Sequence, residues 1–356
     1  MKKILFLLFT CAALNAFSQN EFMANGKVTD SATGLPLAGA SVFCQNTTFG
    51  SISNSEGEFK LGLPAGGYDL VISYTGYETR LLRIHNSNAA NLQIALKAKD
   101  KSLQEVAVTG SAAVADGYQK YGKFFFDHFI GTSPNAMQCS IQNPDVLVFY
   151  FYKKRNRLKV KAKEDLVIVN NALGYKVKFQ LDSFAHEYET DISTYTGFPF
   201  FEPMPGSNDD STRWKQNREN AYAGSRLHFV RSWYDSTLAD EGFVIERVDS
   251  ASKTLKTYPI TDPYDSSLYN VVENHDVEIS FNGRLRILYN NAPPDPAYLH
   301  SSHLPNTLHA QISILDISEG FIIQQNGYFY DQNDVINTGY WSWEKLGDAL
   351  PYDYNP

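Results

Sequence analysis

Short hydrophobic runs alternate with turn residues through the first part of the chain, from residue 22 to about residue 98. In Phe59-Lys60-Leu61 the apolar side chains take every second position, so that one face of a strand would be buried and the other exposed to water. Turns rich in glycine and proline recur about every 8 to 12 residues, which is typical of an antiparallel β-sandwich. Strands are predicted at 23–29, 40–44, 47–52, 58–63, 68–74, 78–85 and 92–96.

The pattern changes from residue 117 onward, where helical and strand periodicities are mixed. A helix is predicted at 118–129, and a second helix is expected to be capped by Asp210 or Ser211, interrupted near Gly224 and ended at Gly242. Further strands are predicted at 146–152, 158–162, 165–169, 175–181, 243–248, 276–281, 284–289 and 308–314. The chain is therefore expected to be mainly β, with a seven-stranded sandwich at 22–98, a linker at 99–116 and an α+β domain at 117–356.

Five motifs in the first region occur in order: 26–30 (GKVTD), 33–42 (TGLPLAGASV), 56–59 (EGEF), 63–70 (LPAGGYDL) and 74–77 (YTGY). Together they resemble the carboxypeptidase regulatory-like family. The resemblance implies a transthyretin-like β-sandwich, known both beside some metallocarboxypeptidases and as the N-terminal extension of TonB-dependent receptors of Bacteroidota. It implies no catalysis by the sandwich itself.

Two further resemblances concern the rest of the chain. Residues 103–110 (LQEVAVTG) are similar to the segment that joins this module to the plug of those receptors. The residues after 110 are too few for a barrel of about 22 strands, so the segment is expected to be a plain linker, with capture by a partner strand as the alternative. Residues 139–144, 170–176 and 222–229 resemble a domain that follows the sandwich in uncharacterised Bacteroidota envelope proteins.

The first 18 residues predict export. A basic start at Lys2 and Lys3 precedes an apolar run over residues 4–14, and small residues precede a cleavage site between Ser18 and Gln19. A lipoprotein cysteine at Cys11 is the weaker alternative. We therefore expect a periplasmic, outer-membrane-associated or secreted protein, at most peripherally attached to a membrane. The net charge of −8 argues against nucleic acid as a partner.

The two cysteines that remain after export, Cys44 and Cys139, fall in different predicted domains. They could form one bridge in an oxidising compartment. Two separately buried thiols are the favoured interpretation, because a chain of this length needs no covalent staple.

Two surface segments are candidate binding sites. Seven cations lie within eleven residues: Lys153, Lys154, Arg155, Arg157, Lys159, Lys161 and Lys163. They alternate with Leu158 and Val160, which predicts the wet face of a hairpin that turns near Asn156. One interpretation is that the lysines protect an edge strand from pairing with another sheet. The other is that they bind anions, namely lipid phosphates or an acidic envelope partner.

The second segment, residues 195–205, is aromatic and stiffened by proline. Tyr195, Phe198, Phe200 and Phe201 could stack on a sugar or grip a partner, because rigid aromatic rings are low-entropy anchors. A loop packed on the domain's own core is the commoner role of such a segment.

Catalytic chemistry has weak support. His186 and Glu189 have the His-x-x-Glu spacing of zinc carboxypeptidases, with His303 and His309 further along, but chance explains such a pair. The loop histidines His300 and His303 are expected to be surface residues. We assign no catalytic residue, cofactor or metal and expect a non-enzymatic protein that binds an envelope protein, for example a TonB-dependent receptor, or a glycan. An envelope hydrolase, metallopeptidase-like or otherwise, with its site in 117–356 is kept as the alternative.

Overall fold

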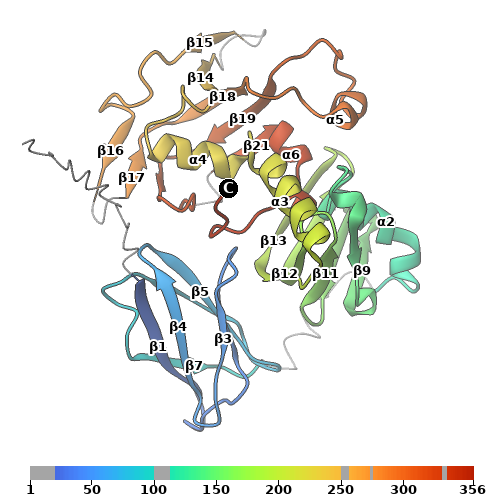
Figure 1. Cartoon of the computed structure of the whole chain (residues 1–356). Helices are drawn as coiled ribbons and strands as arrows, with labels where there is room; N and C mark the ends of the chain where they lie inside the picture. Colours follow the sequence, from blue (N-terminus) through green and yellow to red (C-terminus); the bar gives the residue numbers. More distant parts are fainter. Residues whose placement is uncertain (1–20, 100–112, 250–255, 273–275, 331–334) are drawn as a thin grey trace, which may run out of the picture.

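The computed structural model describes residues 21–99, 113–249, 256–272, 276–330 and 335–356. The predicted signal peptide at 1–18 and the segment 103–110 lie outside the described residues. The protein is mainly β, with several open sheets, an N-terminal sheet domain and a later α+β region (Figure 1). This confirms the predicted fold class.

The N-terminal region is a sandwich of two sheets. Its strands are β1 (Glu21–Asp30), β2 (Ser41–Cys44), β3 (Gly50–Ile52), β4 (Glu58–Pro64), β5 (Tyr68–Ser73), β6 (Arg80–Ile84) and β7 (Leu92–Leu96). One sheet has the order β4-β1-β7 and the other β3-β2-β5-β6. All pairs are antiparallel except β1 with β7. The alternation noted in the sequence is seen in β4, where Phe59, Leu61 and Leu63 are buried between exposed neighbours.

The middle of the chain forms a six-stranded sheet covered by one helix. The strands are β8 (Cys139–Ile141), β9 (Leu147–Tyr152), β10 (Arg157–Ala162), β11 (Leu166–Asn170), β12 (Tyr175–Glu187) and β13 (Ile192–Pro203), in the order β8-β11-β12-β10-β9, with β13 on β12. The short helices η1 (Ala136–Gln138), η2 (Pro144–Val146) and η3 (Lys153–Arg155) connect them. Helix α2 (Gly117–Phe129) packs Phe125 and Phe129 on Phe149, Phe184 and Phe179 of the sheet.

The last part of the chain contains helices α3 (Asn208–Tyr222), α4 (Arg226–Tyr234), α5 (Pro296–Ser301), α6 (Tyr340–Trp343) and η6 (Leu346–Asp348). Strands β14 (Phe243–Val248), β15 (Thr257–Pro259), β18 (Gly283–Tyr289), β19 (Gln311–Ile317) and β21 (Val335–Gly339) form a sheet in the order β15-β14-β18-β19-β21. A smaller sheet joins β16 (Tyr269–Val271), β17 (Val277–Ile279) and β20 (Phe321–Ile323). Helix α4 lies against these sheets through Phe229 and Trp233, both of which are buried.

Some predicted boundaries were wrong. The N-cap of α3 is Ser207, whose hydroxyl accepts from the Asp210 backbone while the Asp210 carboxylate accepts from the Ser207 backbone. The helical region ends at Tyr234, not at Gly242, although the interruption at Gly224 is confirmed. The aromatic segment 195–205, expected to be a loop, is mostly strand β13.

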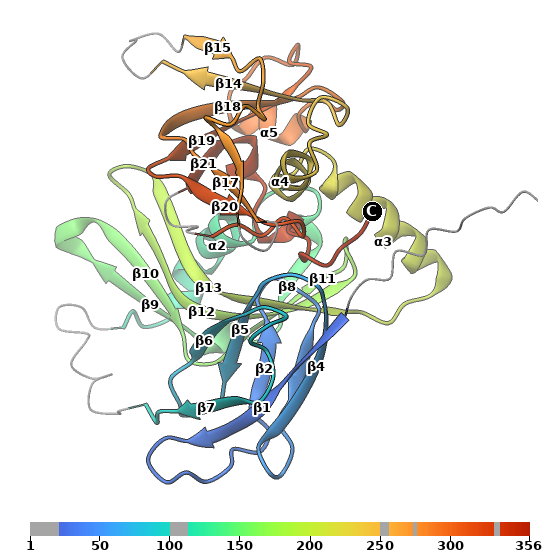
Figure 2. The same ribbon diagram turned by 90° about the vertical axis from the view of Figure 1, so that its left-hand side faces the viewer.

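Three hydrophobic cores result. The sandwich core is built only from residues between Phe22 and Leu96, whereas the middle core also takes in Leu346 and Leu350 from the end of the chain. The final residues thus return to the centre of the molecule and lie between the sandwich, α3 and α4 (Figures 1 and 2). Cys44 is buried in the sandwich core and Cys139 is half-buried, and both are free thiols.

Candidate functional site

A cavity of about 1500 Å³ lies between the sandwich and the C-terminal region. The sandwich contributes the turns at 64–68 and 85–87. The opposite wall comes from α4, the residues that follow it, and residues 324–326. Residues 352–356 form a third side. We call this cavity the interdomain cleft.

Arg83, on β6, fastens the sandwich to the opposite wall of the cleft. Its guanidinium lies over the rings of both Tyr328 and Tyr330, 4.2 and 4.4 Å from their centroids. It also donates to Asp69 at 3.1 Å and to Gln324 at 2.7 Å. The Tyr328 hydroxyl donates to the same Asp69 carboxylate at 2.5 Å. The positive charge of Arg83 is thus paired with a carboxylate and also packed on aromatic rings. This contact holds the two walls of the cleft at a fixed separation.

Strand β13 makes the second attachment of the sandwich. The Phe200 and Phe43 rings are 5.2 Å apart, and the Asn46 amide donates to the Pro199 carbonyl at 2.8 Å. Gly50 is required at this contact, since a Cβ there would lie 2.6 Å from the Phe200 ring. The candidate residue Phe200 is therefore used in a contact within the molecule.

The other predicted aromatic residues are spread over the same strand. Phe201 is buried in the middle core, and Tyr195 packs edge-on against Phe129 at 5.0 Å while remaining 39% exposed. Phe198 is half-buried. The four rings thus face different surroundings and do not form one sugar-stacking platform.

On α4, the His228 imidazole is held in one tautomer. The Gly224 backbone N–H donates to His228 Nδ1 at 3.1 Å, so Nε2 carries the proton and donates to the Glu241 carboxylate at 3.1 Å. Burial lowers the pKa of His228, with the Glu241 carboxylate acting in the opposite direction. A neutral imidazole with both nitrogens engaged is a fixed support for Glu241, which is half exposed toward the cleft.

The rest of the cleft wall is polar and aromatic. The carboxylates of Asp235, Glu241 and Asp276 line it together with the amide of Asn86 and the ring of Tyr222. Burial raises the pKa of Asp235. Such a surface offers hydrogen-bond acceptors and ring faces, which suits a polar polymer better than a small apolar ligand.

The basic segment lies elsewhere, and none of its cations lines the interdomain cleft. The predicted hairpin is confirmed, with Asn156 at a φ of 44° in its turn and Leu158 and Val160 buried behind Lys159 and Lys161. The edge-strand interpretation was wrong for Lys159, because β10 pairs there with β9 on one side and β12 on the other, whereas the pairing with β12 ends at Val160. Burial, followed by repulsion from Lys161 and Arg157, lowers the pKa of Lys159.

The structure does not bring His186 and Glu189 together as a pair of zinc ligands. His186 is buried, with Nδ1 2.9 Å from Ser193 Oγ, whereas Glu189 is exposed. Ser193 Oγ also lies 2.9 Å from His128 Nδ1, and burial lowers the pKa of both imidazoles. In the part of the chain that the structure describes, no three His, Cys, Asp or Glu side chains are grouped so that they could hold a metal ion. Within the same residues no helix is long and apolar enough to cross a membrane.

The N-terminal geometry agrees with the family comparison, in which residues 24–108 match the CarboxypepD_reg-like domain. The N-terminal part of this chain is a CarboxypepD_reg-like domain. In residues 26–77 this domain carries the five motifs noted in the sequence. Residues 113–356 lie beyond the match.

Curated relatives match over about a third of the chain. The TonB-dependent receptor P39 of Formosa agariphila is 34% identical over 110 residues, which is 30% of this chain and 10% of the receptor. The TonB-dependent receptor SusC of Bacteroides thetaiotaomicron is 34% identical over 116 residues, 32% of this chain and 11% of the receptor. The chain thus spans about a tenth of the length of the curated relatives it matches.

Two solved structures share some likeness. A mutant type II cohesin–X-dockerin complex from Acetivibrio cellulolyticus has a TM-score of 0.16 and 24% identity over 21% of this chain and 50% of that one. A DUF3823 family protein from Bacteroides ovatus has a TM-score of 0.18 and 8% identity over 52% of this chain and 82% of that one.

The sequence did not reveal the residues that shape the interdomain cleft. Arg83 and Tyr328 are 245 positions apart, and Arg231 reaches Tyr352 across 121 positions. The one local signal was the tail sequence Tyr352-Asp353-Tyr354, in which an acid lies between two rings. The predicted site residues share a high local density of charge or of aromatic rings, and the structure places them outside the cleft.

Proposed function

We propose that this protein is a non-enzymatic binding protein of the bacterial cell envelope, whose interdomain cleft holds a protein or glycan partner. The CarboxypepD_reg-like domain acts as a docking module that supplies one wall of the site. The export signal expected at residues 1–18 and the TonB-dependent receptors among the relatives support an envelope location, in the periplasm or at the outer membrane. A TonB-dependent receptor is a specific candidate partner.

The observation that carries the proposal is the preformed cleft between two attached regions. Its volume of about 1500 Å³ exceeds the range of roughly 300 to 1000 Å³ that is usual for small-molecule sites. Because Arg83 and Phe200 fix the sandwich at two separate points, ordering the walls costs little when a partner binds. A polymer that fills such a cleft can contact both regions at once.

Affinity purification tests the proposal directly. The tagged mature protein would be isolated from gently solubilised envelopes, and co-purifying proteins, glycans and metals would be measured in the same sample. We expect one abundant, stoichiometric partner. A Ser87→Trp variant places a large ring in the cleft and should reduce the amount of this partner by about tenfold or more.

Ser55→Trp is the matched control, because Ser55 is an exposed turn residue of the same sandwich and does not line the cleft. Capture of the same partner by wild type, Ser55→Trp and Ser87→Trp alike would contradict the cleft as the binding site. Stoichiometric zinc, or turnover of peptide or glycan libraries by a partner-free sample, would favour the hydrolase alternative instead.

A further inference from the structure

We propose that the ligand of the interdomain cleft is a peptide turn with an acidic residue between aromatic residues, and that residues 352–356 occupy its place within the chain. This inference rests on the proposed function and narrows the partner to a protein. The tail shows how the cleft recognises a peptide, because it is itself bound there through contacts that another peptide could reproduce.

The first set of contacts is to the main chain. The Arg231 guanidinium donates to the carbonyl oxygens of Tyr352 at 2.9 Å and Tyr354 at 2.8 Å, and its Nε donates to the Asn326 carbonyl at 3.1 Å. The Tyr352 amide donates to the Asn46 carbonyl of the sandwich at 2.6 Å. The Tyr354 amide donates to the Pro351 carbonyl at 2.9 Å, so the segment forms a turn. Main-chain groups are common to all peptides, so these contacts would hold another segment that adopts the same turn.

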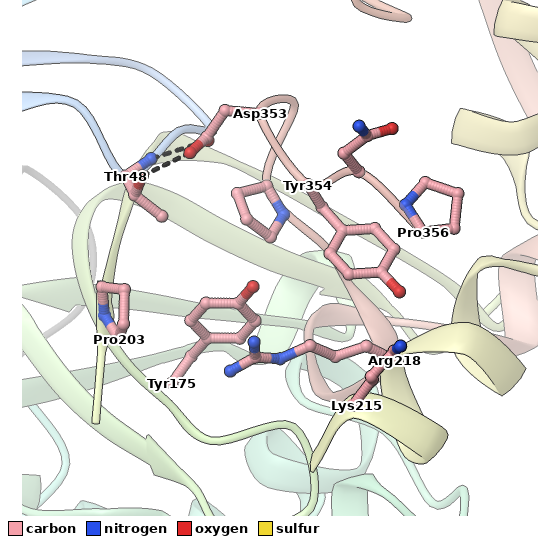
Figure 3. A pocket seen from close by; sticks show the side chains of 10 residues that line it. Thr48, Tyr175, Pro203, Lys215, Arg218, Asp353, Tyr354 and Pro356 are labelled. Carbon is pink, nitrogen blue, oxygen red and sulfur yellow. Dashed lines mark hydrogen bonds between the residues drawn. The ribbon is translucent and has the colours of Figure 1, made fainter. Parts of the chain in front are cut away.

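The second set recognises an acid. The backbone amide of Thr48 donates to Asp353 at 2.8 Å, and the Thr48 hydroxyl donates to the other carboxylate oxygen. Figure 3 shows this pair beside a smaller pocket of about 420 Å³, with Arg218 lying across Tyr175 and Lys215 nearby. The Thr48 amide and hydroxyl therefore hold both oxygens of the acid, which favours a carboxylate side chain there.

The third set recognises aromatic side chains. The Tyr352 ring lies 5.9 Å from that of Tyr328, and the Tyr354 ring lies 5.8 Å from that of Tyr222. The two tyrosines thus contact rings on the C-terminal region while the acid between them contacts the sandwich. Both regions must be in place for all three positions to be filled.

The tail also separates two cavities. Residues 353–356 line the smaller pocket and the interdomain cleft alike. Tyr352, Asp353 and Tyr354 are half-buried, and Asn355 and Pro356 are exposed. Displacement of this segment would join the two cavities into one groove, with Arg231 and Thr48 freed to bind a segment from the partner.

Peptide binding to a shortened chain tests the inference. A fluorescein-labelled peptide, Pro-Tyr-Asp-Tyr-Asn-Pro, would be titrated by anisotropy against the full chain and against a chain that lacks residues 352–356. The shortened chain should bind at least about tenfold more tightly, because the tail no longer competes from within. Arg231→Gln in the shortened chain should weaken binding by about tenfold or more, since it removes charge-assisted hydrogen bonds.

The matched control is Arg213→Gln, an exposed arginine of α3 that does not line either cavity, and it should leave binding unchanged. A labelled peptide with lysine in place of aspartate should bind more weakly than the original. If the shortened chain keeps the wild-type circular dichroism and tryptophan fluorescence but does not bind the peptide, the inference is wrong. It is also wrong if a neutral oligosaccharide binds the shortened chain and the peptide does not.

A second variant covers the case in which the shortened chain does not fold. Asp353→Asn in the full chain removes the charge held by Thr48 and should loosen the tail, so the labelled peptide should bind several-fold more tightly than to wild type. Unchanged binding would overturn the inference. The proposed function would survive that result if the envelope partner were still lost on Ser87→Trp, so the two failures are distinguishable.

Discussion

The sandwich and the region after it are stabilised in different ways. The sandwich core closes within residues Phe22 to Leu96, and each of its sheets is built from strands of that segment. The middle core instead joins Phe125 near its start to Leu350 near the end of the chain. Local closure makes the sandwich a self-contained folding unit, whereas the rest of the protein is complete only when its last residues return.

The largest expected change in the free energy of unfolding comes from removing one buried leucine side chain from the core of each region. Leu70 of the sandwich and Leu285 of the C-terminal core are both fully buried, so replacing either by alanine should lower the free energy of unfolding by about 2 to 5 kcal/mol. All four tryptophans, Trp214, Trp233, Trp341 and Trp343, lie after the sandwich. Tryptophan fluorescence therefore reports on that region alone, while far-ultraviolet circular dichroism reports on both.

Leu285→Ala should move the denaturant midpoint seen by fluorescence, and Leu70→Ala should move mainly the transition seen by circular dichroism. Each variant is the control for the other, because the chemical change is the same. If both probes shifted together in both variants, the two regions would unfold as one cooperative unit, and the sandwich would not be a separate folding unit.

The same difference explains which elements were predictable. The seven strands of the sandwich follow from local alternation and from turns whose glycines and prolines fix the reversals. Strand β13 was missed because Pro199 and Pro203 argue against a strand. Proline is tolerated there because β13 pairs along its length only with β12, and the Pro199 carbonyl accepts from Asn46 of the distant sandwich. That partner is invisible in the local sequence.

The second prediction uses two aspartates whose pKa values move in opposite directions. Burial raises the pKa of Asp348 to about 6, against the hydrogen bonds donated by Ser133 and Asn135. In the sandwich, the Tyr77 hydroxyl and further donors lower the pKa of Asp30 to about 2. An acid whose pKa is higher in the folded than in the unfolded state stabilises the fold while it is protonated, and this stabilisation is lost as the pH rises. An acid whose pKa is lower in the folded state stabilises the fold while it is ionised, and this stabilisation is lost as the pH falls.

The fluorescence-detected free energy of unfolding should therefore fall by about 2 to 3 kcal/mol as the pH rises from about 4 to about 6, and Asp348→Asn should flatten this slope. The sandwich should instead lose stability as the pH falls from about 4 toward 2, with Asp30→Asn as its matched variant. Urea unfolding at a series of pH values measures both. A slope that Asp348→Asn leaves intact would show that another group, such as the buried Glu344, dominates.

The third prediction concerns the contact that joins the two regions. Phe200→Ala removes the ring that packs on Phe43, and a double-mutant cycle with Phe43→Ala should give a coupling energy of about 0.5 to 1.5 kcal/mol. Phe198→Ala, two positions away on the same strand face, should show no coupling to Phe43. Equal coupling for both phenylalanines would mean that the cycle reports a general change in β13.

The residues that shape the interdomain cleft were harder to predict from the sequence than the strands and helices. A cluster of seven cations is a local pattern that can be seen in the sequence. A single arginine in a strand, such as Arg83, looks like any solvent-exposed charge. Its role depends on the rings of Tyr328 and Tyr330, which the fold brings into contact with its guanidinium. Residues that connect distant regions carry no local pattern, so the cleft could be found only from the structure.

The smallest effect on stability is expected from replacing lysines of the basic segment, residues 153–163. Lys159 and Lys161 point away from the core on β10, and Lys163 is exposed just beyond the strand, so replacing all three by glutamine should change the free energy of unfolding by no more than about 0.5 kcal/mol. Lys120→Gln with Lys123→Gln, two exposed lysines on α2, is the control.

The same triple variant tests whether these lysines bind anions. In a protein of net charge −8 they form a local positive surface, so removing them should reduce association with isolated envelopes at low salt. The difference should disappear at high salt, because exposed charges are screened beyond about 8 to 10 Å at physiological ionic strength. Association that stays unchanged at low salt would leave the lysines as a solvated face of the middle sheet, and binding would then belong to the interdomain cleft.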